Sequence, residues 1–308
     1  MFKIWRQLKR SPSYLYRNVI LPRLLTRQYK NILQKNLAVK NIYAGQRCFI
    51  LGSGPSIKDL DLNEFRNEHV LVVNEFDRHP QFKNLRRVCH AIPDTYYFTE
   101  DKNTYYWERL KNKSDNAGAD TIFFFHLISK ELIEKEGLFP KNKVYYISTQ
   151  GIISEHFDFN IDLDKTLPWP KNSLLSCLMI AVYMGFREIY LLGCEHSFLA
   201  ARIGPEHGQS KTFDHFYVNP ELEQISKMNK EEAEKKMRER YRWSSEDVNS
   251  SYENTMQHIL QLFKNYRLFY KKVRQAYPGI KIFNATPHSL LDVFPFIKYE
   301  EIAKTHGS

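Results

Sequence analysis

Seven short apolar runs, separated by polar or helix-periodic segments, constrain the fold of this chain most strongly. Several runs are continuous rather than alternating, which is typical of parallel strands buried on both faces of a sheet. Helical periodicity follows most of them, so strands and helices alternate. This order predicts an α/β fold with a doubly wound, mostly parallel sheet. The expected strands are residues 48–51, 69–73, 87–91, 121–126, 143–147, 188–192 and 281–284.

The expected helices fill the gaps between these strands, at residues 57–65, 105–111, 130–135, 173–184 and 252–276. Residues 195–250 break the pattern, because they are polar and charged, have no strand-like run and include a helical charge run over 229–242. A long insertion directly after a strand is often a lid over a site. We therefore expect a helical lid here.

The net charge of +10 is concentrated at the N-terminus. Residues 1–40 hold ten Lys and Arg and no Asp or Glu, while the other 268 residues hold 35 basic and 35 acidic side chains. Nucleic-acid binding by the body of the chain is therefore not supported. We expect a basic amphipathic helical arm (residues 1–45) and one domain, residues 46–308.

The mixture of basic, aromatic and aliphatic residues in the arm suits an anionic membrane surface. A helix that packs on its own domain, or on a partner subunit of a homo-oligomer, would have the same composition. The arm has no apolar stretch of about 18 residues, so it predicts no spanning helix. The expected location is cytoplasmic, with peripheral attachment at the inner face of the plasma membrane as one interpretation.

The four cysteines all lie inside apolar runs, and none forms a C-x-x-C pair. This pattern is typical of reduced core cysteines in a cytosolic protein. It indicates neither a disulfide framework nor a zinc site.

A glycine-rich turn follows the first expected strand, with the sequence Gly52-Ser53-Gly54-Pro55-Ser56. Glycine lets the backbone approach a ligand closely, and a helix N-terminus offers unpaired N–H groups. The turn therefore predicts a contact with the phosphate or ribose of a nucleotide. A plain strand-to-helix turn is the alternative interpretation.

Polar residues recur where the expected strands end, and ligands of open α/β sheets bind beyond those carboxyl ends. Each residue alone could be a cap or a turn residue, but their recurrence favours hydrogen bonding to ribose, base and phosphate. The candidate nucleotide-binding residues are Gly52, Ser53, Gly54, Ser56, Asn74, Asp94, Ser173, Glu195, His196 and Asn284.

Histidines are the candidate general bases, because their pKa lies near the operating pH. We favour His215, in the middle of the expected lid, with its neighbour Asp214 as the group that orients it, over His196 and His207. Glu195 and His196 alone are weak evidence for a metal site, and none is expected. The chain has no G-x-S-x-G, H-E-x-x-H or Walker pattern.

Four blocks of the chain together resemble the bacterial sialyltransferases of glycosyltransferase family forty-two, and the wider set of polysaccharide-biosynthesis proteins related to 6-hydroxymethylpterin pyrophosphokinase. The blocks are Gly52-Ser53-Gly54-Pro55-Ser56, Val73-Asn74-Glu75-Phe76, the segment from Ser173 to Gly193, and Ala285-Thr286-Pro287-His288-Ser289-Leu290-Leu291. The resemblance spans roughly residues 46–298 and excludes the arm.

The resemblance implies a single Rossmann-like domain with a lid, and metal-independent, inverting transfer of sialic acid or a related sugar from a CMP-activated donor to a glycan hydroxyl in surface polysaccharide biosynthesis. The donor is a substrate, and no cofactor is implied. The nucleotide would contact Ser53, Gly54, Ser56, Asn74 and Ser173, and the base would be His215. Ser53 and Asp94 stand where the family has asparagine.

Two other functions remain open on the sequence. One is a pyrophosphokinase-like enzyme that uses ATP and Mg²⁺, with Asp94 and Glu195 as metal ligands. The other is a non-catalytic nucleotide-binding protein that the arm recruits to a membrane.

Overall fold

A seven-stranded sheet, in the order β5-β4-β3-β2-β1-β8-β9, lies at the centre of the computed structural model, which describes residues 12–155, 159–197, 215–217, 220–225, 227–241 and 252–304. Every pair of neighbouring strands is parallel. All seven expected strands are present, so the predicted α/β doubly wound, Rossmann-like fold is confirmed. The strands are β1 (Arg47–Leu51), β2 (His69–Val73), β3 (Arg87–Ile92), β4 (Ile122–His126), β5 (Lys143–Ile147), β8 (Glu188–Leu192) and β9 (Lys281–Asn284).

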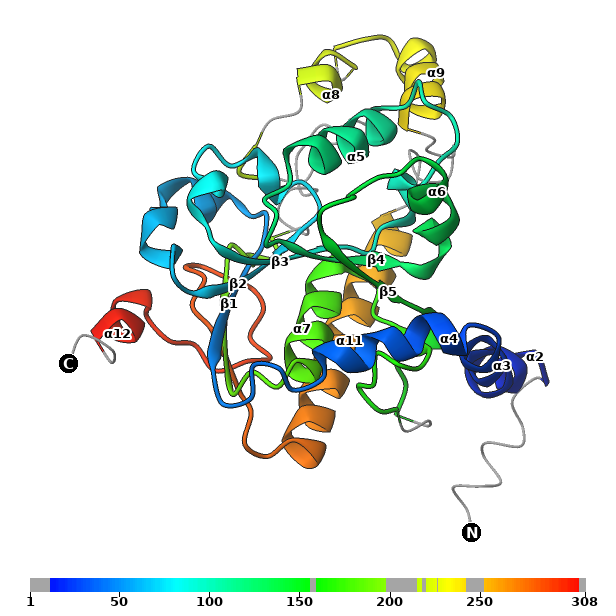
Figure 1. Cartoon of the computed structure of the whole chain (residues 1–308). Helices are drawn as coiled ribbons and strands as arrows, with labels where there is room; N and C mark the ends of the chain where they lie inside the picture. The colour runs from blue at the N-terminus through cyan, green and yellow to red at the C-terminus, as the bar shows by residue number, and fades with distance from the viewer. Residues whose placement is uncertain are drawn as a thin grey trace.

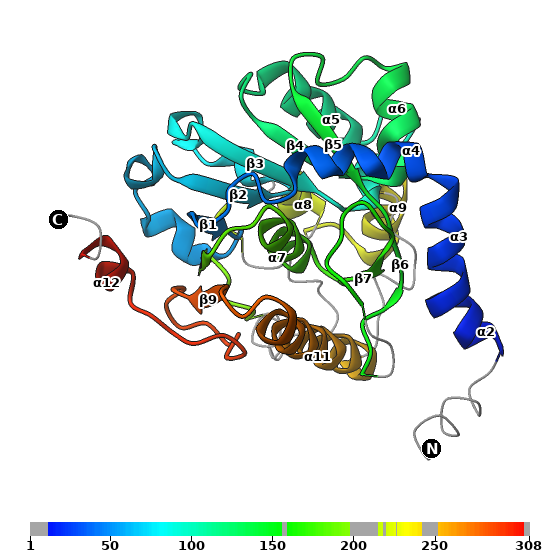
Figure 2. The same ribbon diagram turned by 60° about the horizontal axis from the view of Figure 1, so that its bottom comes forward.

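The sheet is covered on both faces, as its continuous apolar strands require. In β1, Cys48 and Ile50 face the core formed with α7 (Ser173–Tyr183) and α11 (Tyr252–Ala276), while Phe49 and Leu51 face the opposite core. Figure 2 shows α7 and α11 on one side of the sheet and α5 (Tyr105–Asn116) and α6 (Lys130–Lys135) on the other. Residues 174–183 of α7 are all buried, which explains why its sequence is apolar all round.

The sheet grows in opposite directions from β1, with β2 to β5 on one side and β8 and β9 on the other. The chain therefore reverses its strand order between β1 and β8. The carboxyl ends of these strands meet at one edge of the sheet, where ligands of this fold class bind.

The remaining described elements are short and connect or flank the sheet. They are the 3₁₀ turns η5 (Phe76–Arg78), η6 (Phe82–Asn84), η7 (Thr95–Tyr97) and η8 (Leu127–Ser129), the separate pair β6 (Thr149–Ile152) and β7 (Leu167–Trp169), and the helices α8 (Pro220–Ile225), α9 (Lys230–Tyr241) and α12 (Tyr299–Lys304). Helix α9 confirms the helical charge run expected in the insertion, most of whose other residues lie outside the described ranges.

The expected helix over residues 57–65 is wrong. The chain forms two 3₁₀ turns there, η3 (Pro55–Asp59) and η4 (Leu62–Phe65), separated by the extended backbone of Leu60. Asp61 is the N-cap of the second turn, since its side chain accepts the N–H of Asn63 at 3.0 Å. The first turn therefore does not continue into a helix. The helix-like spacing of the apolar residues reflects the burial of both turns on the sheet. Turns this short also have only a small dipole with which to attract an anion.

The arm packs against its own domain over its described length. It comprises α2 (Pro12–Leu15), the π-helix η1 (Tyr16–Ile20), α3 (Leu21–Gln28), α4 (Lys30–Leu33) and the 3₁₀-helix η2 (Gln34–Val39). Figure 1 shows this run in blue beside the β5 edge of the sheet. The buried amide of Asn36 donates to the carbonyl oxygens of Tyr146 at 2.8 Å and Leu163 at 2.6 Å. Within the described residues, no helix is long and apolar enough to cross a bilayer.

Replacing Asn36 by Ala should lower the free energy of unfolding by about 2 kcal/mol, because two carbonyls lose their donor in a buried place. Urea denaturation of Asn36→Ala measures this. The control is Asn31→Ala, an exposed asparagine of the same arm, which should stay within about 0.5 kcal/mol of the unaltered protein. Equal stability of the two variants would contradict the anchoring role of Asn36.

Candidate functional site

Three of the predicted site residues meet at the carboxyl edge of the sheet. Asn74 follows β2, Asp94 follows β3 and Ser173 begins α7. The Asn74 amide nitrogen lies 2.5 Å from Asp94 Oδ2 and 3.0 Å from Ser173 Oγ, and Ser173 Oγ lies 3.1 Å from both Asp94 oxygens. We call these residues the polar triplet. The sequence identified all three, and the sheet order brings them together.

The electrostatics of the polar triplet favour a ligand that donates hydrogen bonds. Burial raises the pKa of the Asp94 carboxyl, while the hydrogen bonds from Ser173 and Asn74 oppose that rise. The Asn74 side-chain oxygen is buried and has no hydrogen-bond partner among the described residues. A hydroxyl or amine of a ligand would satisfy this acceptor, whereas an anion would not.

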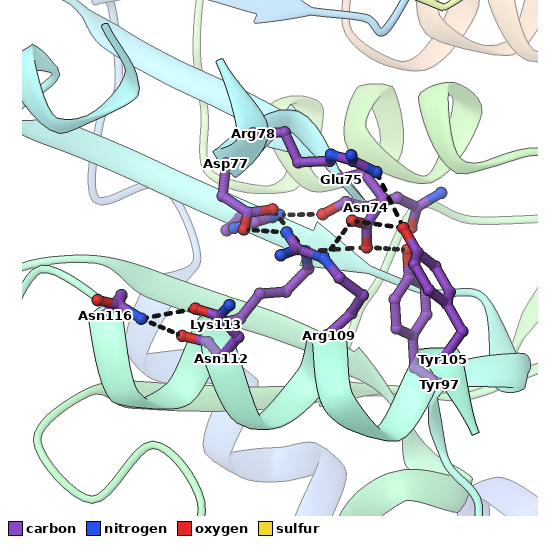
Figure 3. A network of polar contacts seen from close by, with 11 residues as sticks. Asn74, Glu75, Asp77, Arg78, Tyr97, Tyr105, Arg109, Asn112, Lys113 and Asn116 are labelled. Atoms are coloured by element: carbon purple, nitrogen blue, oxygen red, sulfur yellow. Dashed lines mark hydrogen bonds and ion pairs between the residues drawn. The ribbon is translucent and has the colours of Figure 1, made fainter. Parts of the chain in front are cut away.

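A buried ion network holds the turn that carries Asn74. The Glu75 carboxylate accepts hydrogen bonds from Tyr97 Oη at 2.7 Å, Arg109 Nε at 2.5 Å and Lys113 Nζ at 3.0 Å. Arg109 and Lys113 also reach Asp77, at 2.7 and 2.5 Å. Figure 3 shows the two cations rising from α5 towards the residues that follow β2. The network therefore fastens α5 to the turn beside the polar triplet.

The Glu75 pKa records how tightly this network is paired. Burial alone would raise that pKa, but the charges of Lys113 and Arg109 overcome burial and lower it to about 2. The carboxylate is thus ionised at neutral pH. Without it, Arg109 and Lys113 would each lose one of their two carboxylate partners, and the Lys113 ammonium would stay buried.

Glu75→Gln should destabilise the protein in a pH-dependent way. The native pKa of about 2 lies below the ordinary 4.5, so the stabilisation is complete above pH 4.5 and is lost as the pH falls towards 2. It corresponds to about 3 kcal/mol. Urea denaturation should show this difference in the free energy of unfolding between the native protein and Glu75→Gln at pH 7. The difference should shrink as the pH falls below 4.5. The control is Glu300→Gln, which changes an exposed carboxylate. A loss of stability in Glu75→Gln that does not depend on pH would contradict the account.

One described stretch of the insertion, residues 215–217, docks on the loops after β1 and β2. The backbone N–H of Phe216 donates to the Ser53 carbonyl at 2.9 Å, and its ring is buried against Phe76 and His79 with centroids 5.3 and 5.4 Å apart. The Arg78 guanidinium lies over the Tyr217 ring at 4.8 Å. We call residues 215–217 the docked segment.

The docked segment places His215 beside the glycine-rich turn. His215 Nδ1 lies 3.3 Å from the Ser53 carbonyl oxygen, and its ring stacks on Tyr217. A carbonyl only accepts, so Nδ1 carries the proton in this hydrogen bond and Nε2 is the basic nitrogen. Asp214, which was expected to orient His215, lies outside the described residues, as does His207.

The glycine-rich turn (residues 52–56) packs on the end of β8 instead of presenting its backbone to an anion. The Ser56 N–H donates to Glu195 Oε1 at 2.7 Å, and the Gly54 N–H donates to the Gly193 carbonyl at 2.9 Å. A Cβ on Gly54 would collide with the Glu195 carboxylate, and one on Gly52 with the Gly193 carbonyl. These glycines therefore permit the close approach of two strand ends.

The expectation that residues 54–56 receive a phosphate at a helix N-terminus is corrected by this contact. The helix is a short 3₁₀ turn, and its Ser56 N–H already faces a carboxylate. Glu195 was expected at the rim, and it is there, but buried against the turn. Its second oxygen, Oε2, is buried with no hydrogen-bond partner among the described residues, so the site again presents an acceptor.

Gly54→Ala should displace Glu195 and destabilise the protein by about 2 kcal/mol or more, because the added methyl has no space. Thermal or urea unfolding measures this loss. Gly279→Ala is the matched control, since a Cβ there meets no atom within 4 Å. Gly54→Ala as stable as Gly279→Ala would show that the two strand ends do not pack as described.

Two predicted rim residues lie beneath the rim. His196 is buried between the Cys194 carbonyl, 3.2 Å from Nδ1, and the Tyr266 hydroxyl, 3.0 Å from Nε2, and burial lowers its pKa to about 4. Asn284 is fully buried, and its amide and carbonyl groups bond within the turn after β9. Both side chains support the loops of the site from below, so the expectation that they contact a ligand directly is not met.

A cavity of about 440 Å³ opens between the start of α7 and the N-terminal half of α11. Lys171 lies in it, two residues before Ser173, and burial lowers the pKa of its ammonium. The described residues that line the cavity include no carboxylate: they are Lys171, Asn254, Gln257, His258, Leu260, Gln261 and Lys264. Its two lysines, Lys171 and Lys264, make this cavity cationic.

Within the described ranges, no group of three or more His, Cys, Asp or Glu side chains lies close enough to hold a metal ion. The four cysteines are buried and free.

No protein-family model matches the chain, and no curated protein matches it in sequence. Among solved structures, the MAf glycosyltransferase from Magnetospirillum magneticum AMB-1 is similar, with a TM-score of 0.44 and 12% sequence identity. The match covers 87% of this chain and 38% of that one, so this chain spans well under half the length of that protein. The functional proposal therefore rests on the geometry of the site.

Proposed function

We propose that the chain is a glycosyltransferase that moves a sugar from a nucleotide-activated donor to a hydroxyl group of a glycan. The observation that carries the proposal is the position of His215, held by the Ser53 carbonyl 3.3 Å from Nδ1 with Nε2 as its basic nitrogen. His215 thus lies at the loop after β1, and Asn74 of the polar triplet follows the neighbouring strand β2. A nucleotide-binding edge and a general base in one place suit group transfer to a hydroxyl.

The nucleoside would bind at the polar triplet. Asn74 Oδ1 and Glu195 Oε2 are buried acceptors without partners among the described residues. Ribose hydroxyls and the amino group of a base are donors, so they match what these oxygens lack. Asp94 would act by holding Asn74 and Ser173 in register, since both of its oxygens bond to them.

The phosphate would bind away from the glycine-rich turn, at the start of α7. That helix has 11 residues, and the Asn172 side chain caps it by accepting the Leu175 N–H at 2.9 Å. Its N-terminus favours negative charge, and Lys171 lies two residues before Ser173, the first residue of the helix. Both features support this end of the cationic cavity as the place to which the nucleotide phosphate departs.

His215 Nε2 would take the proton of the acceptor hydroxyl as that oxygen attacks the anomeric carbon. The bond from the anomeric carbon to the phosphate oxygen breaks, the configuration inverts, and the bonding electrons leave with the nucleotide. Phe216 and Tyr217 in the docked segment would exclude water, which competes with the acceptor. The resemblance to family forty-two makes a CMP-activated sialic acid, without a metal, the first donor to test.

His215→Asn should lower kcat for transfer by about 100-fold or more, because general-base catalysis contributes on the order of 10²–10⁴. The affinity for the free nucleotide should change less than twofold. A transfer assay with CMP-activated sialic acid and other nucleotide sugars measures both. His69→Asn is the control, since His69 begins β2 at the opposite edge of the sheet.

An unchanged kcat in His215→Asn would show that His215 is not the general base. Nucleotide binding by the native protein without turnover on any donor would instead indicate a non-catalytic binding protein and overturn the proposal.

A further inference from the structure

The outward face of the arm is apolar where a surface helix is normally polar. Tyr16, Ile20 and Leu24 are spaced four residues apart and remain 46, 47 and 49% exposed. Because this spacing places side chains on one helix face, the three form a stripe, which we call the arm stripe. A contiguous exposed apolar stripe of this kind marks an interaction surface.

Contacts between the opposite face of the arm and the domain determine which way the stripe points. The Asn18 side-chain oxygen accepts the backbone N–H of Ile152 at 2.8 Å, and Thr26 Oγ1 accepts that of Thr166 at 2.9 Å. Leu33 and Asn36 are fully buried further along. The arm is thus bonded to the domain at several points, and its stripe points away from the domain.

The stripe is surrounded by positive charge. Arg17, Arg23, Arg27 and Lys30 are exposed on the same part of the arm. Residues 1–40 hold ten Lys and Arg and no acidic residue, whereas the rest of the chain is neutral. The occupant of this face must therefore be both anionic and able to bury apolar side chains.

We propose that the arm stripe and its arginines bind the surface of an anionic lipid membrane, with Tyr16, Ile20 and Leu24 in the headgroup region. Apolar side chains at the interface and cations near anionic headgroups are the two terms that hold interfacial helices to bilayers. The long basic side chains reach the headgroup level beside the buried stripe. This surface lies outside the catalytic proposal, and lipid binding can be measured without any enzyme assay.

Vesicle co-sedimentation of the full chain tests the proposal. Binding should require phosphatidylglycerol in phosphatidylcholine vesicles and should weaken as salt is raised. Ile20→Ser with Leu24→Ser should reduce partitioning about tenfold or more. Arg23→Gln with Arg27→Gln should reduce it about 25-fold, since each basic residue contributes roughly fivefold.

Matched controls come from the β9 edge, at the far end of the sheet from β5. Phe296→Ser removes a 55% exposed apolar side chain, and Lys281→Gln with Lys298→Gln removes two exposed charges. Both should bind vesicles within twofold of the native protein, and unfolding temperatures should be equal for all variants because every changed residue is exposed.

Equal binding with and without phosphatidylglycerol, or equal loss in the stripe and control variants, would overturn the proposal. A dimer in solution that the stripe variant alone dissociates would assign the face to a second copy of the chain, and would also overturn it.

Discussion

The buried carboxylate of Glu75 is the constraint on which the site depends. It is paired with Arg109 and Lys113 of α5 and with the Tyr97 hydroxyl. Immediately before it, Asn74 adopts a left-handed φ of 44°, a conformation that asparagine tolerates better than most residues and that the network and the polar triplet hold from two sides. Arg78, in the turn that follows, donates to Tyr105 of α5 at 3.0 Å and also lies over Tyr217. One network thus supports both the polar triplet and the docked segment that carries His215.

The strands, the fold class and the polar triplet could be predicted from the sequence, because each depends on local pattern. Continuous apolar runs indicate buried parallel strands, and the carboxyl ends of such strands face the same edge. Asn74, Asp94 and Ser173 all stand at such ends, so their meeting needed only that the sheet be wound as expected. Arg109 and Lys113, four residues apart on one helix, carried a signal for the ion network that the sequence analysis did not use.

The role of the glycine-rich turn could not be predicted, because it depends on a contact between distant parts of the chain. Gly54 and Glu195 are 141 residues apart in number, and β1 and β8 become neighbours only in the folded sheet. Glycine-x-glycine after a strand has the same sequence whether a phosphate or a carboxylate of the protein approaches it. The burial of His196 was missed for the same reason, since its partner Tyr266 lies in α11.

The central claim is that a nucleotide binds at the polar triplet, and a thermal-shift panel of CMP, CDP, UMP, GDP and ATP, with and without Mg²⁺, tests it most directly. A ligand that binds only the native state raises the unfolding temperature by mass action. The account predicts stabilisation by CMP or CDP without metal, and its loss in Asn74→Ala, whose side-chain acceptor is gone. Stabilisation that Asn74→Ala retains in full, or that appears only with ATP and Mg²⁺, would contradict it.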